Sequence, residues 1–545
     1  MIPRPLLILA LVSLAAGATR AHHTDPWNTV GWDAADTGSY DHSFSAFYDG
    51  RTSNYRAFWC ATEGGLNSER AVTSTSSNPW GFSSTPTTAL ATTGVRVVRA
   101  GGVFSGRLDH YNFVDQTLTG SSYASGLGYT VDGVIGYLRR TKLTGVATAR
   151  IDECVINSST HFTSKMDNDG TNTECSGAGG TPVTLGYAYN SSTAASGLSE
   201  RYRCVNPSSP YNHFTTSSST CEGSGYTNEG SLGYWRSGAT GEYYDGAYRE
   251  VSPFPDGAYV CPSAVIRDGD YYMLYTASAR FYAGGPFNQV FMATSPSTDG
   301  VTFTPVVDAS GDPVPVISYR SGYPSEVIGR GNATEFSVAF GVGGARLAKV
   351  GSTFYYTYID SSHETGGTAW YWKQSTSSTV GSSLSSPSRL KDGSTYLSSN
   401  DLVASVPVAL YDENPGATNK WWMFSNNHAR DEAYYTNNTD GSTGLDYTVS
   451  GYSGRQLQIA HSDPSGLWAL YSVHGAMTND LGNVDTRYGW YVYAPHSSTS
   501  CSGNDCGVHS IGVTLFDPSA LSPAALLSSR PEGSLRSLFR APQPR

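Results

Sequence analysis

Short apolar and aromatic runs, separated by turns that contain glycine, recur along the chain in a constant order. Between Cys261 and Val306, an apolar run at 262–266, a turn at Gly269 and an aromatic run at 271–275 follow one another. Runs of this length, bounded by turn residues, are typical of β-strands. A unit of three or four such strands hides its apolar faces only by stacking on like units, so the pattern predicts a repeat architecture.

Similar units can be found on both sides of this segment. Together with it they predict an all-β chain built around a five-bladed β-propeller, and the chain shows little helical periodicity. The five units are found at residues 41–74, 261–306, 344–358, 406–424 and 457–493.

Residues 99–238 break this pattern and carry a repeat of their own. Gly128–Tyr129 and Gly225–Tyr226 open two matching segments, and three histidines that precede an aromatic residue are spaced by 51 and 52 positions, at His110, His161 and His213. Three lobes of equal size predict an inserted β-trefoil-like domain with pseudo-threefold symmetry. Packing or a hydrogen bond within each lobe is the expected role of the histidines, ahead of a metal or ligand role.

The eight cysteines fit the same division of the chain. Each of two lobes has its own pair, which predicts the disulfides Cys154–Cys175 and Cys204–Cys221, and Cys501–Cys506 would close a small loop. Cys60 and Cys261 remain, and a bridge between neighbouring blades is left open to them. An even number of cysteines suits an oxidising compartment.

The two ends of the chain differ from the rest. Residues 1–21 combine Arg4, an apolar run at 6–16 and small residues, which predicts a signal peptide and a secreted, extracellular protein. The apolar run is too short to span a bilayer, and no later run is longer. The predicted organisation is therefore a signal peptide (1–21), a first blade (22–98), the insert (99–238), four further blades (239–522) and a disordered tail (523–545).

Composition narrows the class of partner. Only 14% of the residues are charged, and the formal net charge is −11. Nucleic acids and anionic membrane surfaces require clustered Lys and Arg, so both are disfavoured as partners. A neutral oligosaccharide or polysaccharide is compatible with this charge. No Cys or His pair has zinc spacing, and the stretch from Asp167 to Gly170 does not continue into an EF-hand, so we expect no metal and no cofactor.

The repeat text itself resembles a known group of enzymes. The segments PSAVIRDGDYYMLYTA (262–277), VFMATSPSTDGVTF (290–303) and FGVGGARLAKVGSTFYYTYID (340–360) are similar to the five-bladed propeller glycoside hydrolases, which include arabinanases, β-xylosidases and invertase-like enzymes. The resemblance implies a central funnel with three carboxylates at the starts of successive inner strands. Two carboxyl groups, one protonated and one ionised, are needed to cleave a glycosidic bond.

The implied carboxylates are incomplete in this chain. Cys261 stands where the resemblance calls for an aspartate, and Gly344 and Ser405 stand at the other two places. A register that starts at Asp41 restores one carboxylate. Glu326 and Asp360 are acids that could substitute from loops, although acids at such places also serve as turn caps.

Aromatic and amide side chains offer a different chemistry. Sugars lay their C–H faces on Trp and Tyr rings and take hydrogen bonds from polar groups around them. The candidate glycan-binding residues are Trp80, Trp370, Trp372, Trp421, Trp422, Asn426 and Asn427. Because side chains alternate along a strand, only one of each adjacent Trp pair can face a given side, and the others would pack between blades.

Two hypotheses follow. The first, which we favour, is a secreted glycan-binding protein that keeps a glycosidase-like propeller without complete catalytic carboxylates. The second is an active glycoside hydrolase that uses Asp41 as base or nucleophile and a loop acid such as Glu326 as proton donor.

Overall fold

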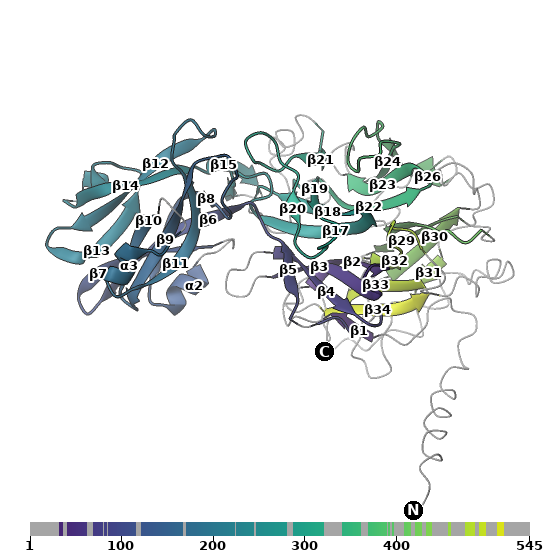
Figure 1. Ribbon diagram of the computed structural model, residues 1–545, viewed down its shortest axis with the longest axis horizontal. Coiled ribbons are helices and arrows are strands. Elements are labelled where there is room, and N and C mark those ends of the chain that lie inside the picture. The colour runs from purple at the N-terminus through teal and green to yellow at the C-terminus, as the bar shows by residue number, and fades with distance from the viewer. Residues whose placement is uncertain are drawn as a thin grey trace, which may run out of the picture.

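The computed structural model consists of strands almost throughout and shows two bodies side by side (Figure 1). No helix among the described residues is long and apolar enough to cross a membrane. The described residues are 32–35, 41–62, 69–79, 81–83, 85–115, 121–166, 170–223, 225–244, 247–280, 287–320, 341–360, 369–389, 391–392, 395–396, 408–415, 420–427, 432–438, 456–458, 475–484, 490–496 and 510–516.

The larger body is a five-bladed propeller, as the sequence predicts. Its described strands form five four-stranded antiparallel meanders, and the first strand of each lies innermost. The first two blades are β2 (Asp41–Asp49), β3 (Asn54–Thr62), β4 (Glu69–Ser76) and β5 (Thr87–Leu90), then β17 (Tyr259–Asp268), β18 (Asp270–Ser278), β19 (Gln289–Ser295) and β20 (Thr304–Pro305), with β21 (Pro315–Ile317) also on β19. The third and fourth are β22 (Val342–Val350), β23 (Thr353–Asp360), β24 (Ala369–Ser375) and β25 (Ser388–Arg389), then β28 (Val408–Tyr411), β29 (Trp421–Asn427), β30 (Glu432–Asn438) and β31 (Gln456–Gln458).

The fifth blade closes the ring with a strand from the other end of the sequence. β32 (Gly475–Thr478), β33 (Trp490–His496) and β34 (Ser510–Phe516) are completed by β1 (Trp32–Ala35), which pairs antiparallel with β34. β2 then pairs parallel with β32, so the first and fifth blades share one sheet. One detail differs from the sequence prediction: residues 456–458, expected in the fifth blade, form the outermost strand of the fourth, because β31 pairs with β30.

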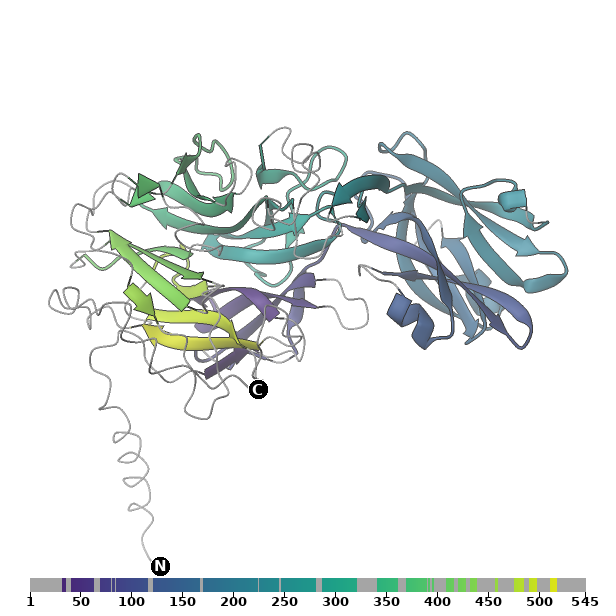
Figure 2. The same ribbon diagram turned by 180° about the vertical axis from the view of Figure 1, so that it is seen from behind.

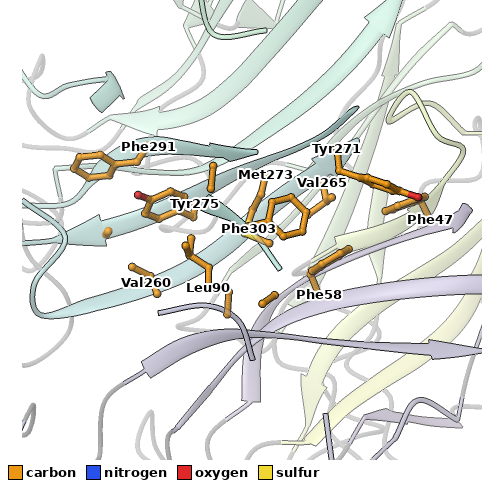
Figure 3. Close-up of a cluster of buried hydrophobic side chains, with 14 residues drawn as sticks. Phe47, Phe58, Leu90, Val260, Val265, Tyr271, Met273, Tyr275, Phe291 and Phe303 are labelled. Carbon is orange, nitrogen blue, oxygen red and sulfur yellow. The ribbon is translucent and has the colours of Figure 1, made fainter. Parts of the chain in front are cut away.

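Neighbouring blades are held together by aromatic packing. Between the first and second blades, Phe47, Phe58, Tyr271, Phe291 and Phe303 lie in one fully or almost fully buried cluster (Figure 3). The Phe58 and Phe303 rings meet edge to face at 5.5 Å. Burying one such ring contributes about 1.5–3 kcal/mol, so this cluster stabilises the joint between the two blades.

The smaller body is a three-lobed module between β5 and β17. Each lobe is a hairpin, a short helical turn and a return strand that pairs back onto the first strand of the hairpin. The lobes are β6 (Gly94–Phe104), β7 (Arg107–Val114), α2 (Ser121–Gly126) and β8 (Thr130–Arg139); β9 (Thr148–Asn157), β10 (Thr160–Met166), α3 (Thr173–Gly177) and β11 (Thr181–Tyr189); and β12 (Leu198–Asn206), β13 (Ser209–Thr216), η1 (Cys221–Gly223) and β14 (Thr227–Arg236). The predicted boundary at 98/99 falls inside β6, and the β-trefoil assignment stays a prediction.

Two lobes carry the predicted disulfides and the first lobe carries a substitute. Cys154–Cys175 and Cys204–Cys221 each join a hairpin strand to the following helical turn. In the first lobe the corresponding positions are Ala100 on β6 and Ala124 on α2, and both are fully buried in one cluster. Cys501 and Cys506 lie outside the described residues.

This equivalence predicts that the first lobe accepts a disulfide. The double substitution Ala100→Cys and Ala124→Cys should form a third bridge in the module and raise its free energy of unfolding by about 1–2 kcal/mol, because the link restricts the unfolded chain. Non-reducing mass analysis and calorimetry test this. A free thiol at both positions after oxidation would show that the lobes are not equivalent there.

Buried arginines connect the module to the second blade. Arg139 and Arg236 end the equivalent strands β8 and β14, and both reach the Asp312 carboxylate, at 3.3 and 2.8 Å. The two guanidinium groups also lie over the Phe254 ring, at 5.5 and 4.6 Å. The module therefore docks on the propeller through one end of its pseudo-threefold axis, and the reverse view shows the same narrow junction (Figure 2).

Candidate functional site

The mouth of the propeller, where the inner strands begin, is the candidate site. Three neighbouring inner strands each carry a β-bulge close to their start, between His42 and Ser45, between Pro262 and Ala264, and between Gly343 and Arg346. Bulges are over-represented next to active sites, where they re-aim side chains. The strand pairs that follow these bulges show which residues of the three strands are equivalent.

Strained backbone supports the same location. Ser43 on β2 has φ 54° and Gly344 on β22 has φ 58°, and both lie inside the bulges. A non-glycine residue in this region costs about 1–3 kcal/mol and persists only where its surroundings hold it there. The strain at Ser43 therefore marks the mouth as a built feature and not as simple packing.

Counting from the bulges places one carboxylate among three equivalent positions. Four residues before the first pair that follows the bulge, at Ser45, Ala264 and Arg346, this position holds Asp41 on β2, Val260 on β17 and Val342 on β22, and Cys261 is equivalent to His42. The sequence comparison had placed Gly344 at the third position, and the bulge moves this position to Val342. The side chain of Asp41 and the whole of Ser405 lie outside the described residues.

Cys261 has no free thiol. It forms a disulfide with Cys60 of β3, so the bridge between neighbouring blades that the sequence left open is present. Both residues are buried, at 2% and 0% exposure. The position for which the resemblance implies an aspartate thus holds a cross-link between the first and second blades.

A buried arginine lies just beneath the mouth. The Nη1 group of Arg346 donates hydrogen bonds to the carbonyl oxygens of Phe44, at 3.2 Å, and of Ser263, so it ties the third blade to the first two. Burial lowers the pKa of Arg346 to about 9. The charge at this depth is positive, which is the opposite of the carboxylate pair that hydrolysis requires.

Asp360 is the described candidate acid nearest to the mouth. It ends β23 directly opposite Val342, and only 1% of it is exposed. Burial lowers the pKa of Lys373, and the negative charge of Asp360 partly offsets this effect. In this conformation the Asp360 carboxyl group is not open to a substrate. Glu326 lies outside the described residues.

Two of the candidate glycan-binding residues are packing residues here. Trp421 and Trp422 are 3% and 4% exposed, and the Trp421 ring meets Tyr355 and Tyr411 edge-on at 5.2 Å. Neither indole presents a face to a ligand. Trp80 lies outside the described residues, as do the side chains of Trp370, Trp372, Asn426 and Asn427, whose backbones belong to β24 and β29.

At the opposite end of the propeller, the segment after β32 is bonded to the second and third blades. The backbone N–H groups of Arg267 and Lys349 donate to the carbonyl oxygens of Asp480 and Leu481, at 2.6 and 2.9 Å. The amide of Asn483 reaches Lys349 and Glu413. These contacts tie the fifth blade to the second, third and fourth blades.

The module contains a second set of polar side chains around its axis. Asn112, Thr163 and Thr215 occupy equivalent positions on β7, β10 and β13, and their side chains meet at 2.6 to 3.0 Å. The three histidines lie two residues earlier, and each ring packs on the neighbouring lobe and not on its own, which corrects the expected packing within each lobe; His213 also pairs with Glu229 of its own lobe. Among the described residues, no group of three or more His, Cys, Asp or Glu side chains is placed to hold a metal ion.

Comparisons with known proteins give only distant similarities. No protein-family model and no curated protein match the sequence. Similar solved structures include a glycosyl hydrolase from Bacteroides ovatus (14% identity over 47% of this chain and 66% of that chain, TM-score 0.29). They also include the α-L-arabinofuranosidase from Podospora anserina in complex with cellotriose (11%, 69% and 93%, TM-score 0.28) and the α-L-arabinanase from Penicillium chrysogenum complexed with arabinobiose (10%, 90% and 98%, TM-score 0.30). Because each TM-score is below 0.5, the propeller fold rests on the strand pairing, and no activity is transferred from these enzymes.

Proposed function

We propose that the chain is a secreted carbohydrate-binding protein whose propeller takes a glycan at its mouth and does not hydrolyse it. The observation that carries the proposal is the Cys60–Cys261 disulfide, at the position for which the resemblance to the propeller glycoside hydrolases implies an aspartate. With Val260 and Val342 at the positions equivalent to Asp41 on the next two inner strands, one carboxylate remains of three. Hydrolysis needs two carboxyl groups about 5–10 Å apart across the scissile bond.

The remaining features of the mouth favour a binding role over a purely structural one. The bulges and the strained Ser43 maintain an irregular, polar entrance that packing alone does not require. Cysteines joined in three disulfides among the described residues agree with an oxidising, extracellular compartment.

The test combines binding and hydrolysis on one panel. The full-length protein, incubated with arabinan, xylan and fructan, should be retarded by at least one of them in affinity electrophoresis and should release no reducing sugar above the blank. Asp41→Asn should weaken the retardation by about tenfold to a hundredfold, because hydrogen bonds to a charged group contribute about 1.5–3 kcal/mol. Asp270→Asn is the matched control, since Asp270 is an exposed acid in the β17–β18 turn at the other end of the blade.

A second candidate, an active glycoside hydrolase, is favoured by one observation. Asp41 begins β2 and Asp360 ends β23, so both lie where inner strands begin. In that case Asp41 would activate a water molecule or attack the sugar, and Asp360 or Glu326 would protonate the leaving oxygen. Sugar release that Asp41→Asn abolishes and Asp270→Asn leaves intact would replace the binding proposal with this one.

A further inference from the structure

The three junctions between lobes of the module share one contact. In each, a histidine ring lies against the aromatic ring that follows the equivalent histidine of the neighbouring lobe. The pairs are His161 on Tyr111 at 4.6 Å, His110 on Phe214 at 5.5 Å and His213 on Phe162 at 5.5 Å. The lobes are therefore joined cyclically, and residues at one junction can be compared with those at the others.

At the junction of lobes 1 and 2, the Nδ1 atom of the histidine has a buried carboxylate as its partner. The Nδ1 atom of His161 lies 2.7 Å from Oδ2 of Asp109, and the Tyr129 hydroxyl donates to the same oxygen at 2.5 Å. All three residues are buried. Burial and the hydrogen bond to Asp109 raise the pKa of Tyr129, so its hydroxyl stays a donor.

The junction of lobes 1 and 3 repeats this arrangement with an amide. The Nδ1 atom of His110 lies 3.2 Å from Oδ1 of Asn212, and Nδ2 of Asn212 donates to the Tyr226 hydroxyl at 2.6 Å. Asn212 stands at the position of Asp109, and Tyr226 stands at the position of Tyr129. A polar side chain and a tyrosine thus accompany the histidine at both junctions.

The junction of lobes 2 and 3 lacks both companions. Thr160 stands at the position of Asp109 and Asn212, and Gly180 stands at the position of the two tyrosines. The Nε2 atom of His213 lies 3.3 Å from the Glu229 carboxylate. Its Nδ1 atom is buried and has no hydrogen-bond partner within the described part of the chain.

A side chain of this protein could not easily replace the missing tyrosine. A Cβ atom added to Gly180 would collide with the Sγ atom of Cys154, and Ile156 lies beside it. A buried nitrogen without a partner costs about 1–3 kcal/mol, and such groups call for an explanation. Thr160, Gly180 and His213 are each partly exposed, whereas Asp109, Tyr129 and His161 are buried, so this junction is the more accessible of the two.

Its place in the module also leaves it open to a large ligand. Strand β9 pairs its first residue, Thr148, with Tyr189, next to the arginines that dock on the propeller. Thr160 begins β10 at the other end of the same hairpin, opposite Asn157. The unpaired histidine is therefore at the end of the lobes that points away from the propeller.

We propose that the junction of lobes 2 and 3 binds one monosaccharide unit of a glycan. The sugar ring takes the place that the Tyr129 and Tyr226 rings occupy at the other junctions, and one of its hydroxyl groups bonds to Nδ1 of His213. Ile156 supplies an apolar contact for the C–H face, and Glu229 and Arg203 lie at the edge as hydrogen-bonding groups. This site is separate from the propeller mouth and does not depend on the function proposed for it.

The substitution Thr160→Asn tests the proposal, because it restores the companion that Asn212 gives to His110. Saturation-transfer NMR of the full-length protein with glucose, galactose, mannose, xylose, arabinose and N-acetylglucosamine should show transfer to at least one sugar. Thr160→Asn should raise the thermal stability of the module and weaken that sugar's affinity by at least about tenfold, which corresponds to 1.4 kcal/mol. Ser158→Asn, an exposed change in the same turn, should leave both unchanged.

The outcomes separate this site from the propeller mouth. Loss of transfer in Thr160→Asn but not in Asp41→Asn assigns the sugar to the module. Saturation transfer to the sugar that persists in Thr160→Asn, or that is absent for all six sugars, overturns the proposal. Water would then be the partner of His213 Nδ1. A shift of the His213 ring resonances on addition of the sugar, lost in the variant, is the direct readout.

Discussion

Removal of the Cys60–Cys261 disulfide by the double substitution to alanine is expected to lower the free energy of unfolding of the propeller by about 2–5 kcal/mol. The bridge spans 201 positions of sequence and joins β3 to β17. Between these strands the chain leaves the propeller to form the module, so no short connection links the first blade to the second. Calorimetry under non-reducing conditions should show the propeller transition at a lower temperature.

A matched control separates this effect from a general loss of cross-linking. The substitutions Cys154→Ala and Cys175→Ala remove a bridge that closes only 21 positions inside the second lobe. They should destabilise the module and leave the propeller transition in place. An unchanged propeller transition in the Cys60 and Cys261 double variant would mean that aromatic packing alone holds the two blades together.

The regularity of the blades is what made the fold predictable from the sequence. Aromatic strands such as 271–275 alternate clearly, and each blade repeats the same order of strand and turn. The closure by β1 could not be predicted, because Trp32–Ala35 is a four-residue strand whose partner lies at the far end of the chain. The same limit misplaced residues 456–458, since a three-residue outer strand has no pattern of its own.

Local disulfides could be predicted, but the chemistry of the mouth could not. Cys154–Cys175 and Cys204–Cys221 follow from short spacing within one lobe, while Cys60–Cys261 depends on which blades adjoin. Three bulges shift the register near the mouth, and a bulge leaves no signature in a pattern of alternating residues. The sequence therefore predicted Cys261 and Gly344 at the positions of two implied carboxylates, whereas the strand pairing places Val260 and Val342 at the positions equivalent to Asp41.

The histidines illustrate the same division. Their spacing of 51 and 52 residues along the chain predicts three lobes. Their ring contacts, however, are made between lobes, because the cyclic arrangement places each histidine ring on an aromatic ring of the neighbouring lobe. Spacing along the chain reports that repeats exist, and only the pairing of strands reports how the repeats face one another.

The axis of the module contains one carboxyl group where the other two lobes have arginines. Glu153 occupies the position of Arg99 and Arg203. Across the three hairpins, Arg99 is paired with Asn112, Glu153 with Thr163, and Arg203 with Thr215. Only 1% of Glu153 is exposed, and its oxygens accept hydrogen bonds from the Asn112 N–H group at 3.0 Å and the Thr163 hydroxyl at 2.7 Å. Burial, reinforced by the nearby charge of Asp109, raises the pKa of Glu153 to about 8 in spite of these hydrogen bonds.

Glu153→Gln is therefore expected to stabilise the module at alkaline pH and to flatten its pH dependence. Below its unfolded pKa of 4.5, Glu153 is protonated in both states; between that pH and about 8 only the folded state keeps the proton, so stability falls as pH rises. At about 1.4 kcal/mol for each unit, the loss is on the order of 5 kcal/mol by pH 9, and glutamine avoids it because it stays neutral. Module unfolding measured by calorimetry from pH 4 to 9 tests this, with Glu174→Gln, an exposed charge change in the same module, as the control. Burial also raises the pKa of Asp256 to about 6, which gives a smaller loss of stability with rising pH that both variants share. Parallel curves of stability against pH for the wild type and Glu153→Gln would show that Glu153 ionises normally.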